Sequence, residues 1–215
     1  MAAAIIAVDK PYGWTSTAVV RWVKRRWKVR KAGHAGTLDP LATGLVLVAI
    51  EEATAEIAQL QAEQKEYYAL LMMGYRSLSD DAEYPPEQVA DPGILSPEMR
   101  RSVLRTFEGE ILQRPPAFSA LKLQGKRAYS LARKGVPVDI PPRYVCIHRI
   151  EEVFYHPPYR WMLRVECGKG VYIRSLARDI GEKVGWGAYL GALRRTRIGP
   201  YHVRNSVQPD AVSVG

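Results

Sequence analysis

The stretch Gly33-His34-Ala35-Gly36-Thr37-Leu38-Asp39-Pro40-Leu41-Ala42-Thr43-Gly44 places one carboxylate among glycines and small residues. Glycine lets a backbone approach a ligand closely, and a residue before proline is biased away from the α-helical region. We therefore expect Asp39 on a loop or at a helix start. Two interpretations are open at this point. Asp39 and Pro40 can form the N-cap and first position of a helix, or the loop presents the carboxylate to a bound ligand.

A basic segment precedes this stretch directly. Residues 21–31 include seven Lys and Arg side chains and no acidic residue. Val19, Val23 and Trp27 recur at four-residue spacing, which predicts a helix with one apolar face and a cationic remainder. We expect this helix to run from about residue 15 to Gly33, since glycine is the usual residue just past a helix end.

The whole chain is basic, with 31 Lys and Arg against 22 Asp and Glu and a formal net charge of +9. This charge indicates a polyanionic partner, and nucleic acid is favoured over lipid because aromatic residues that can stack on bases lie among the basic ones. Cys146 and Cys167 have neither CxxC spacing nor a histidine pair nearby, so no zinc or redox site is indicated. The sequence has no signal peptide and no apolar run of about 20 residues, and we expect a soluble, cytoplasmic protein.

Strand and helix patterns mix without regular βαβ alternation, which predicts an α+β fold with helices flanking one mixed, mainly antiparallel sheet. The expected strands are residues 5–8, 45–50, 65–73, 144–155, 161–167 and 190–203. The later helices are expected at residues 53–62, from residue 96 onward, and at 173–184. Residues 113–143 are rich in proline and basic residues and are interpreted as an RNA-binding insertion with a short helix at 128–134. A chain of 215 residues suits a single domain over 1–215 that includes this insertion.

Residues 33–44 resemble the signature of the TruB-type tRNA pseudouridine synthases. Five further segments match motifs of that family in its order along nearly the whole chain: Asp9-Lys10-Pro11-Tyr12-Gly13-Trp14-Thr15-Ser16, Lys65-Glu66-Tyr67, residues 114–126, Cys167-Gly168-Lys169-Gly170-Val171-Tyr172-Ile173-Arg174 and Leu193-Arg194-Arg195. The resemblance implies a pseudouridine-synthase-like catalytic domain and an isomerase that converts uridine to pseudouridine.

Asp39 is the catalytic residue that the resemblance implies. A carboxylate with an ordinary pKa of about 3.9 is already ionised near neutral pH and needs no activating base. The reaction breaks the bond from ribose to nitrogen 1 of the base, rotates the base and rejoins it through carbon 5. Addition of Asp39 to the ribose and proton abstraction by Asp39 are both compatible with the sequence.

The substrate-binding residues implied by the resemblance are His34, Tyr67, Tyr172, Arg174 and Leu193. Arg174 is expected to pair with the catalytic aspartate, Tyr67 to stack on the target base, and Tyr172 and Leu193 to line the same pocket. His34 is expected to contact the RNA. Without the motifs, each of these side chains has an ordinary structural explanation, as a solvated arginine, a structural histidine or a core residue.

A uridine inside folded RNA must leave its stack to be modified. We expect the surrounding phosphates to contact basic side chains of the first helix and of the insertion, namely Lys24, Arg25, Lys28, Lys31, Lys122, Lys126 and Arg127. The four histidines have no metal-ligand spacing, and we expect no metal and no organic cofactor.

The leading hypothesis is a monomeric enzyme that modifies the T-loop uridine of tRNA (position 55) and binds the T-arm without a guide RNA. An RNA-folding chaperone and a guide-dependent subunit of a ribonucleoprotein are the alternatives. The chain departs from the family in two places. It ends soon after Val203, so we expect no C-terminal PUA-like module, and residues 77–84 lack the usual Thr-Asp-Thr and final glycine.

Overall fold

A computed structural model describes the backbone of residues 3–119, 121–123, 126–133 and 138–209, without the side chains of residues 122, 123, 126, 127 and 129. The helices are α1 (Ser16–Trp27), α2 (Ile57–Ala62), α3 (Pro97–Arg105), α4 (Ala128–Ala132) and α5 (Ile173–Val184), with 3-10 helices η1 (Glu51–Glu56) and η2 (Val203–Asn205). The strands are β1 (Ala4–Lys10), β2 (Ala32–His34), β3 (Thr43–Ile50), β4 (Lys65–Met73), β5 (Tyr75–Arg76), β6 (Glu87–Gln88), β7 (Gly109–Gln113), β8 (Lys122–Leu123), β9 (Lys126–Arg127), β10 (Arg143–His156), β11 (Arg160–Cys167), β12 (Ala188–Ile198) and β13 (Tyr201–His202).

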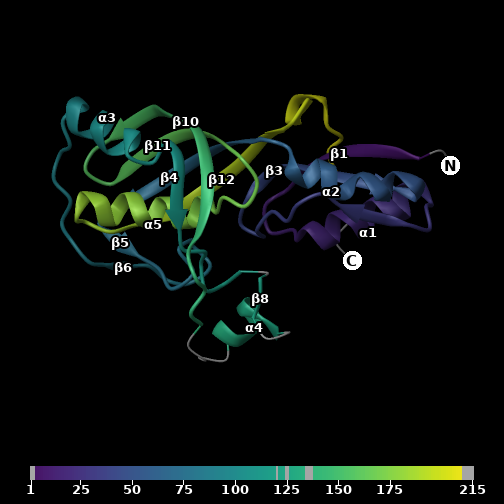
Figure 1. Ribbon diagram of the computed structural model, residues 1–215, viewed down its shortest axis with the longest axis horizontal. Coiled ribbons are helices and arrows are strands. Elements are labelled where there is room, and N and C mark those ends of the chain that lie inside the picture. The colour runs from purple at the N-terminus through teal and green to yellow at the C-terminus, as the bar shows by residue number, and fades with distance from the viewer. Residues whose placement is uncertain (1–2, 120, 124–125, 134–137, 210–215) are drawn as a thin grey trace. The chain divides into compact units, whose positions relative to one another are not determined.

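Most of these strands form one mixed sheet. Hydrogen-bonded neighbours follow the order β1-β3-β12-β4-β11-β10-β7, with β2 on β3 and β13 on β12. β1 and β3 are antiparallel, as are β7 and β10, whereas β3 and β12 are parallel. The predicted α+β class with a mixed sheet and flanking helices is confirmed (Figure 1).

The chain groups into two compact units, and the strands β4, β11 and β12 run from one into the other. Within the described residues, the first unit holds 3–68, 166–169 and 193–209. The second holds Ala69–Val165 and Gly170–Ala192. The assignment of 1–215 to a single catalytic domain stays a prediction.

In the first unit, β1 pairs with β3 along its whole length, from Ala4 opposite Ile50 to Lys10 opposite Gly44. β3 is buried at every position but its first, as expected of a strand covered on both faces. One apolar cluster of this unit joins β3 to α2 and to the end of β12; its buried members are Ala35, Leu45, Leu47, Leu60 and Ile198.

Val19 and Val23 of the predicted apolar face of α1 are buried, together with Trp22, whereas Trp27 is half-buried; the other side of the helix is cationic and exposed. It ends earlier than expected, because Lys28 adopts the left-handed conformation (φ 53°) and closes the helix there. Gly33 lies instead in β2, where a Cβ would stand only 2.7 Å from the Cδ1 of Ile57. Position 33 therefore needs glycine for close packing and not to cap a helix. The predicted end of α1 at Gly33 was wrong.

In the second unit, Ser96 caps α3 by accepting a hydrogen bond from the Met99 amide at 3.2 Å, with Pro97 in the first turn. α3 lies beside α5 and β10 (Figure 1). The helix predicted at 173–184 is α5, and its apolar residues Ile173, Leu176 and Ile180 are buried.

The segment 113–143 carries a small sheet of its own. β8 and β9 pair with each other and not with the main sheet, and α4 follows directly. The side chains of Lys122, Lys126 and Arg127 lie outside the described residues, so their predicted contacts with RNA stay predictions. Of the helices in the described part of the chain, none is long and apolar enough to span a membrane.

Gly44 tests how closely β3 and β12 approach. Its φ is 105°, and a Cβ would lie 2.2 Å from the carbonyl oxygen of Arg195 on β12. We expect Gly44→Ala to lower the free energy of unfolding by about 3 kcal/mol or more, because steric overlap adds to backbone strain. Gly13→Ala is the matched control, since φ is 82° there with no atom within 4 Å of the added Cβ. It should cost about 1 kcal/mol. If urea unfolding gives Gly44→Ala and Gly13→Ala the same loss of stability, the close approach of Gly44 to Arg195 does not contribute to the cost.

Candidate active site

The stretch 33–44 forms the connection between β2 and β3 in the first unit. Ala35 donates its amide to the Leu47 carbonyl at 2.9 Å, which extends the pairing of the two strands. The amide of Ala42 then donates to the carbonyl of Asp39 at 3.1 Å, so Pro40 occupies a turn that leads into β3. Residues 33–44 contain no helix. The interpretation of Asp39 as a helix cap is therefore wrong, and Asp39 lies on a loop.

The residue before Asp39 is anchored by Ser16. The Ser16 hydroxyl accepts a hydrogen bond from the Leu38 amide at 2.8 Å and donates to the Leu38 carbonyl at 3.1 Å. Both residues are buried. One hydroxyl at the start of α1 thus satisfies both backbone groups of Leu38 and fixes the loop immediately before Asp39.

The residue after Asp39 is anchored by Lys10, whose side chain is fully buried. Its ammonium donates to the carbonyls of Trp14 at 2.7 Å, Pro11 at 3.1 Å and Pro40 at 3.1 Å. Burial lowers the pKa of Lys10 to about 8, while the carboxylate of Asp39 acts in the opposite direction. The backbone is therefore fixed on both sides of Asp39.

Arg195 on β12 holds the first half of the loop. Its guanidinium is buried and donates to the carbonyls of Leu45 at 2.7 Å, Gly36 at 3.3 Å and Thr37 at 3.4 Å. Burial, followed by the positive charge of Arg195, lowers the pKa of His34, which lies half-buried on β2. A neutral imidazole is favoured there.

Tyr67 and Leu193 belong to the same unit. Tyr67 is buried on β4, and burial raises the pKa of its phenol against the opposing effect of Arg195. The charge of Asp39 also raises the Tyr67 pKa, so the two side chains are near enough to interact. Leu193 is half-buried on β12. The first unit therefore holds four predicted site residues, Asp39, His34, Tyr67 and Leu193.

Arg174 and Tyr172 belong to the second unit. Arg174 is buried in the first turn of α5 and donates to the carbonyls of Phe118 at 2.9 Å and Ser79 at 3.0 Å. Its Nε lies 3.7 Å from the Oδ2 of Asp81. An arginine held in this way is not a solvated surface residue.

The backbone of Tyr172 is fixed by one side chain. Gln113 accepts from the Tyr172 amide at 2.9 Å and donates to its carbonyl at 3.2 Å. The guanidinium of Arg143 lies 5.3 Å from the centre of the half-buried Tyr172 ring. This contact resembles a cation–π interaction and leaves the ring partly accessible.

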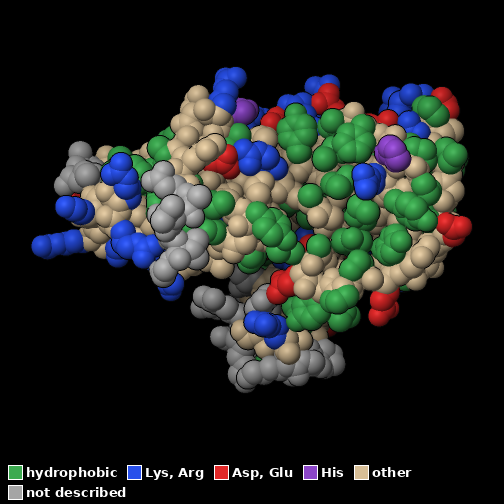
Figure 2. Space-filling view, turned by 180° about the vertical axis from the view of Figure 1, so that it is seen from behind, with side chains coloured by type: hydrophobic (Ala, Val, Ile, Leu, Met, Phe, Trp, Pro, Cys, Tyr) green, Lys and Arg blue, Asp and Glu red, His purple; other side chains and the backbone are tan. Residues whose placement is uncertain are grey.

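The predicted phosphate-binding residues on and after α1, Lys24, Arg25, Lys28 and Lys31, are all exposed. Figure 2 shows Lys and Arg side chains gathered over the part of the molecule that holds α1. Among the described residues, no group of three or more His, Cys, Asp and Glu side chains is placed to hold a metal ion.

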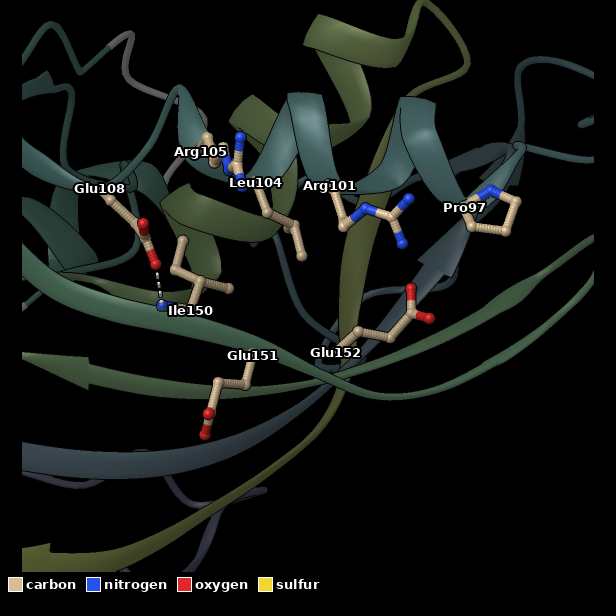
Figure 3. A pocket seen from close by; sticks show the side chains of 8 residues that line it. All are labelled: Pro97, Arg101, Leu104, Arg105, Glu108, Ile150, Glu151 and Glu152. Atoms are coloured by element: carbon tan, nitrogen blue, oxygen red, sulfur yellow. Dashed lines mark hydrogen bonds between the residues drawn. The ribbon is translucent and has the colours of Figure 1, made fainter.

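A cavity of about 370 Å³ in the second unit is lined by none of these residues (Figure 3). It opens between α3 and β10, and the amide of Ile150 donates to Glu108 at its rim at 2.8 Å. Its lining is Pro97, Arg101, Leu104, Arg105, Glu108, Ile150, Glu151 and Glu152. The lining contains no residue of the family motifs, so we do not place the site there.

Sequence reasoning assigned no role to Lys10, Arg195 or Asp81. For Lys10 a signal was present, because it follows Ile6 and Val8 at the inward-facing alternate positions of β1. A lysine at such a position is rarely fully buried without a specific use. Arg195 stands inside a quoted motif, but its sequence position does not distinguish it from Arg194 and Arg197 nearby, which are only half-buried.

Comparison with known proteins identifies the class. A family model described as TruB family pseudouridylate synthase (N terminal domain) matches residues 24–173, and one described as tRNA pseudouridylate synthase B C-terminal domain matches residues 174–214. The tRNA pseudouridine synthase B of Bacteroides fragilis is 44% identical over 211 residues, which cover 95% of this chain and 90% of that protein. The protein of that name from Corynebacterium diphtheriae is 41% identical over 212 residues, 94% of this chain and 70% of that one.

Solved structures agree. A chain in the crystal structure of a Cbf5-Nop10-Gar1 complex matches with a TM-score of 0.73 and 34% identity over 95% of this chain. The present chain covers about half (51%) of that solved chain. The fold and the matches define a pseudouridine synthase, an isomerase. The chain belongs to the TruB family of pseudouridylate synthases.

The pH dependence of stability tests the burial of Lys10. Between the folded pKa of about 8 and the ordinary value of 10.5, the unfolded chain keeps a proton that the folded chain has lost. The free energy of unfolding of the wild type should therefore rise with pH across this window relative to Lys10→Met, by up to about 3 kcal/mol. Urea unfolding at pH 7.5 and pH 10 measures this, with the exposed Lys24→Met as control. If the wild type and Lys10→Met differ in free energy of unfolding by the same amount at both pH values, the lowered pKa of Lys10 is contradicted.

Proposed function

We propose that this chain isomerises a uridine of tRNA to pseudouridine, with Asp39 as the catalytic carboxylate. The observation that carries the proposal is the loop of Asp39, which is fixed on one side by Ser16 through Leu38 and on the other by Lys10 through Pro40. A catalytic group must be held in one geometry to act efficiently. The names of the curated relatives supply tRNA as the substrate.

The chemistry requires an ionised carboxylate at the ribose of the target uridine. The bond between ribose carbon 1 and base nitrogen 1 breaks, the base rotates, and a new bond joins the same ribose carbon to base carbon 5. A proton leaves carbon 5 and nitrogen 1 gains one, so no atom is lost from the RNA. Asp39 either adds to the ribose and is later displaced, or removes and returns a proton. Neither route needs an external base to ionise Asp39.

Tyr67 is proposed to stack on the extruded base. Burial raises the pKa of its phenol and keeps the ring neutral, and its interaction with the charge of Asp39 supports a place beside the reacting group. Leu193 and Tyr172 are proposed to line the pocket, and His34 to contact the RNA as a neutral imidazole. Arg174 is proposed to be part of the substrate-binding site. Its pairing with Asp39 stays a prediction from the family resemblance.

The T-loop uridine at position 55 is the proposed target, and binding to the T-arm is proposed to need no guide RNA and only one copy of the chain. Support comes from the exposed cationic side of α1, which suits the phosphates around an extruded nucleotide. The competing hypothesis, a subunit of a ribonucleoprotein, is favoured by one observation. Solved chains similar to this one belong to a Cbf5-Nop10-Gar1 complex and to an H/ACA RNP bound to a substrate RNA.

The substitution Asp39→Asn tests catalysis. We expect the release of tritium from a T-arm hairpin with carbon-5-tritiated uridine to fall about a thousandfold or more, because the amide can neither attack nor accept the proton. Binding of the hairpin should change little. Asp91→Asn, an exposed carboxylate outside the motifs, is the control and should keep full activity.

Three outcomes would argue otherwise. An active Asp39→Asn enzyme contradicts the role of Asp39. A wild type that binds the hairpin without releasing tritium favours the RNA chaperone. Activity that appears only after a second RNA is added favours the ribonucleoprotein subunit.

The salt dependence of binding tests the cationic side of α1. Lys24 and Lys28 are exposed and one turn apart. If both contact phosphates, Lys24→Gln with Lys28→Gln should weaken tRNA binding and reduce the slope of log K against log salt concentration by about 1.5. Arg101→Gln with Arg105→Gln removes two exposed charges from α3 and should leave the slope unchanged. Equal slopes for the two double variants would contradict the proposed RNA face.

A further inference from the structure

Two arginines one turn apart on α5 hold the same loop of the second unit. Arg174 donates to the carbonyl of Ser79 at 3.0 Å, and Arg178 donates to the Oδ2 of Asp80 at 2.8 Å. Residues four apart on a helix lie on one face, so the two guanidiniums meet consecutive residues of one turn. The backbone of this loop is thereby fixed at two adjacent points.

The same two arginines also hold a second segment. Arg178 donates to the carbonyl of Arg114 at 2.8 Å, and Arg174 donates to the carbonyl of Phe118 at 2.9 Å. The hydroxyl of Ser175 donates to the Arg114 carbonyl as well, at 2.8 Å. Arg178 therefore contacts the loop 77–83 and the segment 114–118. These are the two segments whose carbonyls accept from Arg174.

Asp80 has an unusual backbone for a residue with a side chain. Its φ is 60°, in the left-handed region, which asparagine and aspartate tolerate better than most residues. Its amide donates to the Ser77 carbonyl at 3.1 Å and its carbonyl accepts from the Leu190 amide at 2.9 Å. Its side chain is only 14% exposed. The turn thus directs a largely buried carboxylate at Arg178 in spite of the backbone strain.

We propose that the Asp80–Arg178 ion pair is a positioning element for Arg174. By holding the loop 77–83 and the segment 114–118 together, it keeps the carbonyls of Ser79 and Phe118 where they orient the Arg174 guanidinium. The inference rests on the proposed function, in which Arg174 serves the substrate site. Asp80 and Arg178 act through Arg174 and are positioning residues.

The charge of Asp80 can be lost near physiological pH. Burial raises the pKa of Asp80 to about 6, Arg178 and Arg174 oppose the rise, and Asp179 adds to it. These groups all lie on α5; within its own loop the nearest carboxylate in sequence is Asp81, which accepts from the Ser79 hydroxyl at 2.6 Å. Protonation of Asp80 below pH 6 removes the ion pair, and the orientation of Arg174 weakens.

The test is Asp80→Asn, which keeps the side-chain shape and the tolerance of a left-handed backbone but removes the charge. At pH 7.5 we expect kcat for tritium release to fall about tenfold with KM nearly unchanged, because the carbonyls that orient Arg174 are held less firmly. The ratio of wild-type to variant kcat should approach one at pH 5, because protonated Asp80 resembles asparagine. Arg178→Lys should lower kcat as well, since an ammonium cannot hold Asp80 and the Arg114 carbonyl in the same way.

Asp179→Asn is the matched control. Asp179 also accepts from Arg178, at 3.0 Å, but it lies on α5 beside Arg178 and not on the loop 77–83, so kcat should stay within twofold of the wild type. If Asp179→Asn lowers kcat with the same pH dependence, activity depends on negative charge near Arg178 and not on the contact of Arg178 with the loop 77–83. If Asp80→Asn keeps wild-type kcat at pH 7.5, or shows a pH profile parallel to that of the wild type, the positioning role is wrong.

A readout without substrate separates this inference from the proposed function. The side-chain NMR signal of Arg174, assigned by Arg174→Lys, should shift in Asp80→Asn and when the wild type is acidified through pH 6. An Arg174 signal that does not respond to either change overturns the inference, whatever the activity. Failure of the wild type to release tritium, with a responsive Arg174 signal, overturns the proposed function alone.

Discussion

Buried cations bonded to backbone carbonyl oxygens hold the loops that carry the motif residues. Lys10 has three carbonyl partners, and its three ammonium hydrogens match them in number. Arg195 likewise donates to three carbonyls, of Leu45, Gly36 and Thr37. A buried carbonyl without a partner costs about 1–3 kcal/mol, so each cation satisfies groups that the folded loop would otherwise leave unpaired. The irregular backbone around Asp39 depends on this arrangement, because it has few strand partners of its own.

The same arrangement changes how the charge of the chain is interpreted. The net charge of +9 indicates a polyanionic partner, yet Lys10, Arg174 and Arg195 are buried and cannot contact phosphates from the surface. Part of the positive charge is therefore structural. The surface share lies on residues such as those of α1, where the basic side chains are exposed. Composition predicts the kind of partner, but only burial separates the cations that bind it from those that hold the fold.

The sequence predicts the regular elements well and the site only through its motifs. The apolar run of β3 and the stripe of α1 follow from hydrophobic patterning, and both were found. The end of α1 was missed because it depends on a left-handed Lys28, which propensity disfavours. Burial of Arg174 was not foreseeable from composition, because its acceptors are carbonyls of residues 56 and 95 positions away. Such contacts leave no local pattern.

Carbonyl acceptors also explain how the loop 77–84 can depart from the family pattern and still accept a hydrogen bond from Arg174. All residue types have the same backbone carbonyl and differ only in the side chain. Ser79 therefore accepts from Arg174 through a group that a substitution does not remove. What a substitution can change is the path of the backbone that places this carbonyl. Asp80 acts on the path of the backbone, since its carboxylate accepts from Arg178 and so holds the turn. The backbone contact is thus independent of residue type, whereas its position depends on the particular side chain that holds the turn.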